Sequence, residues 1–214
     1  MIPFEQFLLA HLPEPPARLL EVGCGQGELT TSLAVARYDI VGIDPVAPTG
    51  EFFRRLRLED LEESGEPYDA IVAGSALHHV RDLEAGLDKI VRLLRPDGLL
   101  VLDEFAWDRM DEPTLAWLAE QSRALAAAEG REPAGSLEQL RADWKAEHLG
   151  LHGYEAMRAA LDERFAELAF EWVPYLHRSL GGAPTAVLEQ ALVDGGAIQP
   201  LGFRYAGRPL PTAS

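Results

Sequence analysis

The feature that most constrains the fold is the stretch RLLEVGCGQG at residues 18–27, where an apolar run ends and three glycines follow at alternate positions. Glycine lets the chain turn tightly and lets a ligand approach the backbone closely. At the start of a helix, such a turn makes a ligand cradle. We therefore predict a buried strand over 18–22, a loop over 23–27 and a helix over 27–36. A tight strand–helix turn without a ligand fits the same pattern.

Apolar runs alternate with helical stretches through the first half of the chain. Near-continuous apolar strands separated by helices are typical of a parallel sheet that is covered on both faces. The sequence therefore predicts an α/β fold. Its expected elements are a leading helix over 3–11, strands over 39–44, 54–59, 68–74 and 99–105, a helix over 83–94 and a turn over 95–98.

The second half has a different pattern. Residues 111–167 are rich in Ala, Leu, Glu and Arg, which predicts two or three helices with breaks at 129–135 and 149–153. Two further strands are expected over 170–176 and 200–207, with a helix near 184–193. This helical block runs on into the later strands, so we expect one domain.

Composition narrows the possible partners. The 214 residues carry a net charge near −16, which repels phosphate backbones and anionic membranes, so we expect neither nucleic acid nor membrane as a partner. No stretch approaches the roughly 20 apolar residues of a membrane span, and MIPFEQFLLAHLPEPP does not resemble a secretory signal. The one cysteine, Cys24, excludes an internal disulfide and favours the cytoplasm. We interpret Cys24 as a small residue in a tight loop.

Acidic residues flank the glycine loop. Asp44 ends the second strand, and an acid there can accept both hydroxyls of a ribose, in NAD or in S-adenosylmethionine. The dinucleotide fingerprint G-x-G-x-x-G would need glycine at 28, where the chain has Glu28. Glu28 is best explained as a complement to the helix dipole. Glu21 is well placed to favour the positive end of S-adenosylmethionine.

Five motifs in order resemble class I S-adenosylmethionine-dependent methyltransferases, in the group with ubiquinone-biosynthesis-like domains. They are EVGCGQG (21–27), GIDP (42–45), LEDL (58–61), YDAIVAGSALHHV (68–80) and DLEAGLDKIVRLLRPDGLLVLDEF (82–105).

The resemblance implies a Rossmann-like α/β fold with a seven-stranded sheet and helices on both faces. The last strand would be antiparallel, and a helical insertion would stand between strands five and six. Residues 1–214 would be a single domain, with a cofactor-binding core over 18–105, an acceptor-site insertion over 106–168 and closing strands over 169–207.

The chain departs from the family pattern after its second strand. A full helix usually follows there, but only PVAPTGEFF (45–53) precedes the third strand, and Pro and Gly do not suit a helix. We expect that helix to be short or missing, which affects the adenine side of the pocket.

The resemblance also implies roles for individual residues. Glu21 would serve the methionine end, Gly23 and Gly25 would give backbone access, and Asp44 would bind the ribose. The remaining expected cofactor contacts are Pro45, Leu58, Glu59 and Asp60 on the adenine side, and Gly74 and Ser75 after the fourth strand. S-adenosylmethionine would be the cofactor and S-adenosylhomocysteine its product.

Methyl transfer mainly needs alignment of the nucleophile, with a general base where the nucleophile must lose a proton. His78 and His79 are the candidates, and we choose His78, although a purely structural pair is also compatible with the sequence. Aromatic and His residues of the second half are candidate acceptor contacts or core: Trp107, Trp117, Trp144, Tyr154, Trp172, Tyr175 and His177. His148 and His152 have a metal-ligand spacing, but nearby glycines argue against a helix, so we expect no metal.

The sequence thus predicts an enzyme that moves a methyl group to a small-molecule O, N or C nucleophile. Two alternatives stay open, namely a nicotinamide-dependent oxidoreductase and a protein that binds the cofactor without transferring a methyl group. The acceptor and the oligomeric state are not predicted.

Overall fold

The computed structural model describes residues 4–63, 65–132 and 135–211. Pro3, expected in the leading helix, lies outside them. The chain divides into two compact units. We call residues 2–104, 155–171 and 204–214 the sheet unit, and residues 105–154 and 172–203 the helical unit.

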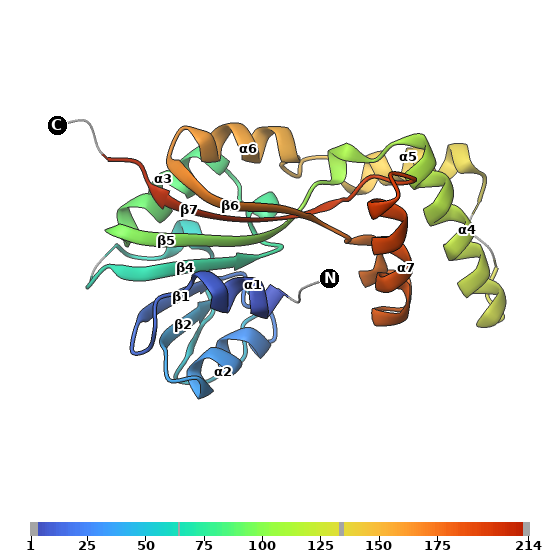
Figure 1. Cartoon of the computed structure of the whole chain (residues 1–214). Coiled ribbons are helices and arrows are strands. Elements are labelled where there is room, and N and C mark those ends of the chain that lie inside the picture. The colour runs from blue at the N-terminus through green and yellow to red at the C-terminus, as the bar shows by residue number, and fades with distance from the viewer. Residues whose placement is uncertain (1–3, 64, 133–134, 212–214) are drawn as a thin grey trace. The chain divides into compact units, whose positions relative to one another are not determined.

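A seven-stranded sheet forms with the order β3-β2-β1-β4-β5-β7-β6 (Figure 1). Strands β1 to β5 pair in parallel and the seventh strand is antiparallel, which confirms the predicted fold class. The strands are β1 (Arg18–Val22), β2 (Asp39–Ile43), β3 (Phe53–Arg54), β4 (Tyr68–Gly74), β5 (Leu94–Phe105), β6 (Phe165–Val173) and β7 (Gly202–Pro209).

Helices cover the sheet because its strands are apolar on both faces. One face packs against α1 (Phe4–His11) and α2 (Glu28–Val35), where Leu8 and Leu33 meet Leu19, Val72 and other buried strand residues. Figure 1 places α3 (Leu83–Leu93) and α6 (Tyr154–Asp162) on the opposite side from α1 and α2. Just after α6, Arg164 pairs with Glu84 and Asp88 of α3.

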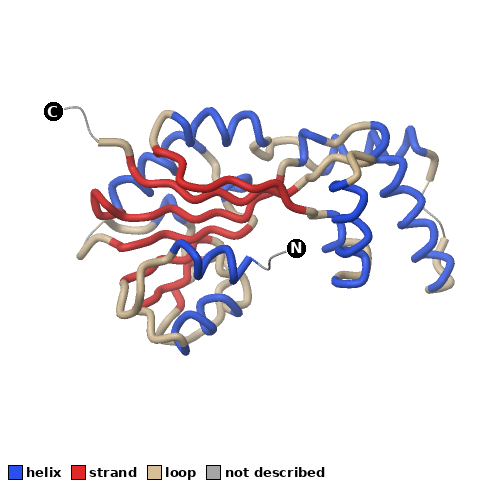
Figure 2. Tube along the Cα trace, in the orientation of Figure 1, coloured by secondary structure: helices blue, strands red, loops and turns tan. Residues whose placement is uncertain are grey.

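The third strand is much shorter than predicted. The prediction placed a strand over 54–59, but β3 contains only Phe53 and Arg54, and residues 58–60 form a 3₁₀ turn instead. The run RRLRLED offers few apolar side chains to an edge strand, so pairing with β2 ends after two residues. Figure 2 shows the strands of the sheet and the loops that connect them to the helices. None of the described residues between β2 and β3 forms a helix, as expected for the Pro- and Gly-rich segment.

Other boundaries also differ from the sequence prediction. The predicted turn over 95–98 lies inside β5, where the register moves from Tyr68↔Leu94 to Ala70↔Leu99, so the extra residues bulge out of the ladder. The sixth strand begins at Phe165 rather than 170, and the seventh ends at Pro209 rather than 207. The predicted division at 18–105, 106–168 and 169–207 stays a prediction.

The helical unit contains α4 (Glu112–Ala128), α5 (Leu137–Glu147) and α7 (Ala183–Asp194). Together with α6, the first two confirm the predicted helices and the breaks between them. The core of this unit gathers Phe105, Leu118, Leu176, Leu180 and Leu201. Within the described ranges, no helix combines the length and apolar character needed to cross a bilayer.

Candidate cofactor site

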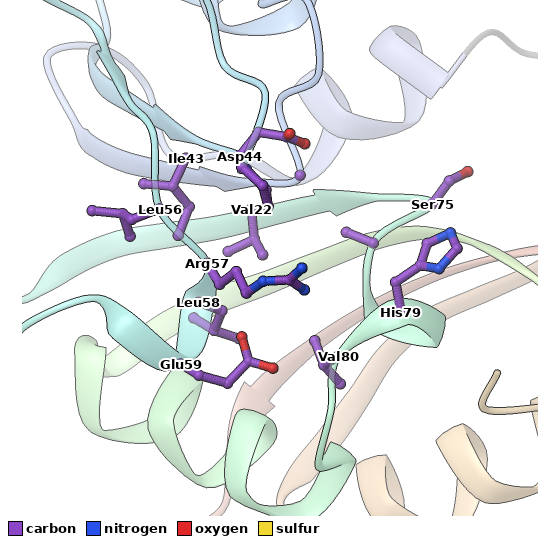
Figure 3. A pocket seen from close by; sticks show the side chains of 13 residues that line it. Val22, Ile43, Asp44, Leu56, Arg57, Leu58, Glu59, Ser75, His79 and Val80 are labelled. Atoms are coloured by element: carbon purple, nitrogen blue, oxygen red, sulfur yellow. The ribbon is translucent and has the colours of Figure 1, made fainter. Parts of the chain in front are cut away.

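A pocket of about 330 Å³ lies in the sheet unit, at the carboxyl ends of β1, β2 and β4. The strand order reverses between β1 and β4, and open α/β sheets bind ligands at such a point. Its volume is within the range of small-molecule sites. The lining residues are Val22, Gly23, Ile43, Asp44, Pro45, Leu56, Arg57, Leu58, Glu59, Ser75, Ala76, His79 and Val80 (Figure 3).

The predicted glycine loop forms one edge of this pocket. All three of its glycines have positive φ, so each takes a backbone conformation that other residues adopt only under strain. A Cβ on Gly23 would lie 2.5 Å from the Cβ of Ala76, so the loop needs glycine here to pass the segment after β4. A Cβ on Gly25 would meet no atom within 4 Å, so open space lies beside its backbone. Gly25 itself is not among the residues that line the pocket.

Asp44 follows β2 and lines the pocket. Its Oδ2 accepts the Gly25 amide at 3.1 Å, and its Oδ1 accepts the Val46 amide at 2.8 Å. Each carboxylate oxygen has two lone pairs, so both oxygens retain capacity for another donor. The half-buried side chain is therefore oriented by backbone amides and remains able to accept hydroxyl groups.

Glu21 is buried at the end of β1, and the structure does not place it on the pocket lining. Its Oε2 accepts a hydrogen bond from the Thr30 hydroxyl of α2. Burial raises the pKa of Glu21, although the hydrogen bonds from Thr30 oppose that shift. Glu21 therefore joins the glycine loop to the helix that follows it.

The 3₁₀ turn over 58–60 forms another side of the pocket. Leu58 is buried and lines it together with Glu59, whereas Asp60 is exposed and does not. The Arg81 amide donates to Glu59 Oε1 at 2.8 Å. Burial acts to raise the pKa of Glu59, but the hydrogen bond from Arg81 and nearby arginines outweigh it, and the pKa lies below its usual value. Figure 3 shows Asp44 and Glu59 with the Arg57 side chain between them in this view.

The segment after β4 supplies the remaining wall. Ser75 and Ala76 line the pocket, whereas Gly74 does not. Ser75 has a φ of 52°, a strained value for a residue with a side chain, and its amide donates to the Asp103 carbonyl at 2.7 Å.

His78 and His79 point to different surroundings, because neighbours in a 3₁₀ turn lie about 120° apart around its axis. His78, the predicted base, is 4% exposed and absent from the lining, with its Nδ1 lying 2.7 Å from Glu104 Oε2. His79 is exposed and lines the pocket. Desolvation, and then the neighbouring His78, lower the pKa of His79, although Glu104 opposes that shift, so the neutral ring is favoured at pH 7.

Sequence reasoning missed several residues that build this site. Glu104 at the end of β5 is fully buried and accepts the amides of Ala76 and Leu77 at 2.8 and 2.6 Å. The sequence does indicate Glu104, because a carboxylate there stands inside the apolar run LLVLDEF. No comparable pattern in the sequence indicates Arg57. Val22 and Ile43 could have been found as the last residues of their strands.

The aromatic acceptor candidates all fall in the helical unit. Several pack on its core, including Trp107, Trp117, Trp144 and Tyr175. Tyr154 and Trp172 contact each other with ring centroids 4.6 Å apart, and His177 Nδ1 lies 3.1 Å from Glu189. Contact with an acceptor stays a prediction for each of them.

His148 and His152 do not share a helix, as the nearby glycines predicted. α5 ends at Glu147, and His148 Nδ1 bonds to the Trp144 carbonyl. Among the residues that the structure describes, no group of three or more His, Cys, Asp and Glu side chains is arranged to hold a metal ion.

Relatives of known sequence share part of this chain. The chain is 35% identical over 111 residues to the ubiquinone biosynthesis O-methyltransferase of Cereibacter sphaeroides, a match covering 46% of this chain and 45% of that protein. The chain thus spans less than half the length of the curated relatives it matches first.

Solved structures share the fold over nearly the whole chain. An S-adenosylmethionine-dependent methyltransferase from Mesorhizobium loti has a TM-score of 0.60 at 19% identity, covering 94% of this chain and 95% of its own. The second structure is the 1,6-didemethyltoxoflavin-N1-methyltransferase of Burkholderia thailandensis, solved with 1,6-didemethyltoxoflavin and S-adenosylhomocysteine bound. Its TM-score is 0.60 at 20% identity, and the match covers 98% of this chain and 77% of that one.

The family relationship rests on a longer match. The sequence model of the family described as "Methyltransferase domain" matches residues 3–163, which is well over half of the chain. The protein therefore belongs to the methyltransferase-domain family, as a class I S-adenosylmethionine-dependent methyltransferase domain.

Proposed function

We propose that this protein binds S-adenosylmethionine in the pocket at the ends of β1, β2 and β4, and transfers its methyl group to a small-molecule acceptor. One observation carries the proposal. The oriented Asp44 carboxylate stands in a pocket bordered by the glycine loop and by the apolar side chains of Ile43 and Leu58. That combination suits a ribose joined to an adenine ring.

Different residues bind the ribose, methionine and adenine portions of the cofactor. Asp44 accepts the ribose hydroxyls through its remaining lone pairs, and the open space beside Gly25 lets the methionine portion pass close to the backbone. Pro45 and Leu58 hold the adenine ring, with Glu59 near its amino group. Glu21 acts from behind the loop, where its carboxylate favours the cationic end of the ligand.

The bound cofactor supplies a methyl group already activated by a sulfonium. The protein then has to exclude water and align the acceptor for in-line attack. Where the acceptor must lose a proton, the base comes from the pair His78 and His79. His79 suits this role better than His78 because it faces the pocket and is neutral at pH 7.

A small molecule is the proposed acceptor class, at oxygen, nitrogen or carbon. The net charge of −16 disfavours nucleic acids, and the Burkholderia methyltransferase of similar fold was solved with 1,6-didemethyltoxoflavin bound. The cytoplasmic location predicted from the single cysteine stays a prediction.

Calorimetric titration tests the cofactor directly. We expect micromolar binding of S-adenosylmethionine and S-adenosylhomocysteine to the wild type and none of NAD. Asp44→Asn keeps the shape of the side chain but removes its charge, so affinity should fall at least about tenfold, in keeping with the lost charged hydrogen bonds. Asp39→Asn, at the exposed opposite end of β2, is the matched control and should bind like the wild type.

Two outcomes would redirect the assignment. Binding of NAD in place of S-adenosylmethionine would favour the oxidoreductase alternative. Cofactor binding without formation of S-adenosylhomocysteine, across a panel of phenols, catechols, amines and heterocycles, would favour a binding protein without transferase activity.

A further inference from the structure

Glu104 is a buried carboxylate that has no role in the methyl transfer proposed above. It lies on β5 and is 0% exposed. Burying a carboxylate is costly unless hydrogen bonds compensate it. Three of its partners lie on one short segment, namely the Ala76 amide at 2.8 Å, the Leu77 amide at 2.6 Å and His78 Nδ1 at 2.7 Å.

That segment is a wall of the cofactor pocket. Ser75, Ala76 and His79 line it, and Glu104 holds Ala76 and the two residues between Ala76 and His79. Ser75 is strained, and strained residues persist only where their surroundings fix them. Ala76 also stands against Gly23, so a displaced turn would disturb the glycine loop.

The same contacts fix the two histidines. Glu104 holds His78 by its Nδ1, and the His78 and His79 rings lie 4.1 Å apart, tilted by 41°. His78 therefore faces the carboxylate while His79 faces the pocket.

From these contacts we propose that Glu104 is a positioning residue. Its carboxylate fixes the turn over residues 76–79 and so presents Ala76 and His79 to the bound cofactor. This role rests on the proposed function, because the pocket wall matters only if the pocket binds S-adenosylmethionine.

A purely structural role is the competing explanation, and the helical unit provides a matched control for it. There Glu189, also fully buried, accepts the amides of Tyr175, Leu176 and His177 and contacts His177 Nδ1 at 3.1 Å. Both glutamates are held by backbone amides and one histidine Nδ1, but Glu189 holds no residue that lines the cofactor pocket. Equivalent substitutions should therefore affect folding similarly and cofactor binding differently.

The test measures S-adenosylhomocysteine affinity by calorimetry in four variants, each first checked for folding by circular dichroism. Glu104→Met removes the acceptor but keeps the length of the side chain, and affinity should fall at least about tenfold. Glu104→Gln keeps a weaker, neutral acceptor for the amides, so its affinity should fall by only about three- to tenfold, a partial rescue. Glu189→Met and Glu189→Gln should bind within about twofold of the wild type.

A second readout needs no ligand. NMR titration of the histidine rings should place the His79 pKa below its ordinary value in the wild type, because the fixed turn desolvates the ring. In Glu104→Met the loss of the carboxylate charge alone would lower this pKa further, because Glu104 raises it. Desolvation is the larger cause, so release of the turn should move the His79 pKa up toward its ordinary value. Should Glu104→Met fail to fold, the same two measurements on Glu104→Gln and Glu189→Gln decide.

Opposite results overturn the proposal. It fails if the folded Glu104 variants bind S-adenosylhomocysteine like the wild type and leave the His79 pKa unmoved or lower it. Equal loss of affinity in the Glu104 and Glu189 variants would also reject it, in favour of a general effect on stability. If the wild type itself binds no S-adenosylhomocysteine, the proposed function fails, and the His79 titration alone then decides whether Glu104 fixes the turn.

Discussion

Gly23→Ala should destabilise the protein much more than Gly25→Ala, although the two glycines belong to one loop. Both have positive φ, 78° and 50°, so each alanine bears the left-handed penalty of about 1–2 kcal/mol. Only at Gly23 does the new methyl meet an obstacle, the Ala76 Cβ at 2.5 Å. Overpacking of this kind costs about 1–3 kcal/mol more.

The two costs give a total near 2–5 kcal/mol for Gly23→Ala. For Gly25→Ala, where no atom lies within 4 Å, only the left-handed penalty remains. Reduced freedom of the unfolded chain offsets about 0.4–1 kcal/mol in both variants alike. The variants should therefore differ by the overpacking cost alone, roughly 1–3 kcal/mol in the free energy of unfolding. In a chain of this size each kcal/mol lowers the melting temperature by about 2–4 °C.

Urea denaturation followed by tryptophan fluorescence measures this difference, with thermal melts as an independent check. Both variants should have the same m-value as the wild type, which shows that the unfolded reference is unchanged. Equal stability of the two variants within about 0.5 kcal/mol would refute the close approach of the loop to Ala76.

Three further predictions follow from buried or paired groups. Burial chiefly raises the folded-state pKa of Glu21, so the stability that Glu21 contributes is present below its unfolded-state pKa and is lost as pH rises through the folded-state pKa. In urea denaturation, Glu21→Gln should therefore gain stability relative to the wild type as pH rises from 4.5 to 7.5. A stability difference between the two proteins that does not change with pH would contradict the shift. Burial raises the pKa of Cys24 to about 12, so iodoacetamide at pH 8 should label the native protein roughly a thousandfold more slowly than the urea-unfolded chain. Mass spectrometry measures both labelling rates, and comparable rates would show an accessible thiolate. Arg204→Met removes the guanidinium that pairs with Asp103 and Glu171, and should lower the free energy of unfolding by about 3–5 kcal/mol. Arg92→Met, at an exposed ion pair, should lower it by less than about 1 kcal/mol. Similar losses in the two variants would argue against the buried network.

The strands and the place of Asp44 at the pocket could be predicted because their signals are local. Apolar runs predicted β1, β2 and β4 closely, and Asp44 stands out as a carboxylate directly after such a run. The third strand was wrong because pairing at a sheet edge depends on neighbours in space, not on the composition of one segment.

The choice between His78 and His79 could not be made from sequence. Adjacent residues of a short 3₁₀ turn face different directions, and the direction depends on where the turn is fixed. Glu104, which fixes it, lies 26 residues further along the chain. The role of Glu21 at the methionine end of the cofactor stays a prediction, and the structure adds that its carboxylate accepts the Thr30 hydroxyl.

A crystal structure of the protein with S-adenosylhomocysteine would test the proposed cofactor site most directly. We expect the ribose hydroxyls within about 2.5–3.0 Å of the Asp44 carboxylate oxygens, with the adenine ring against Leu58 and the side chain of His79 facing the ligand. Density for the ligand at another place, or a ribose turned away from Asp44, would contradict it.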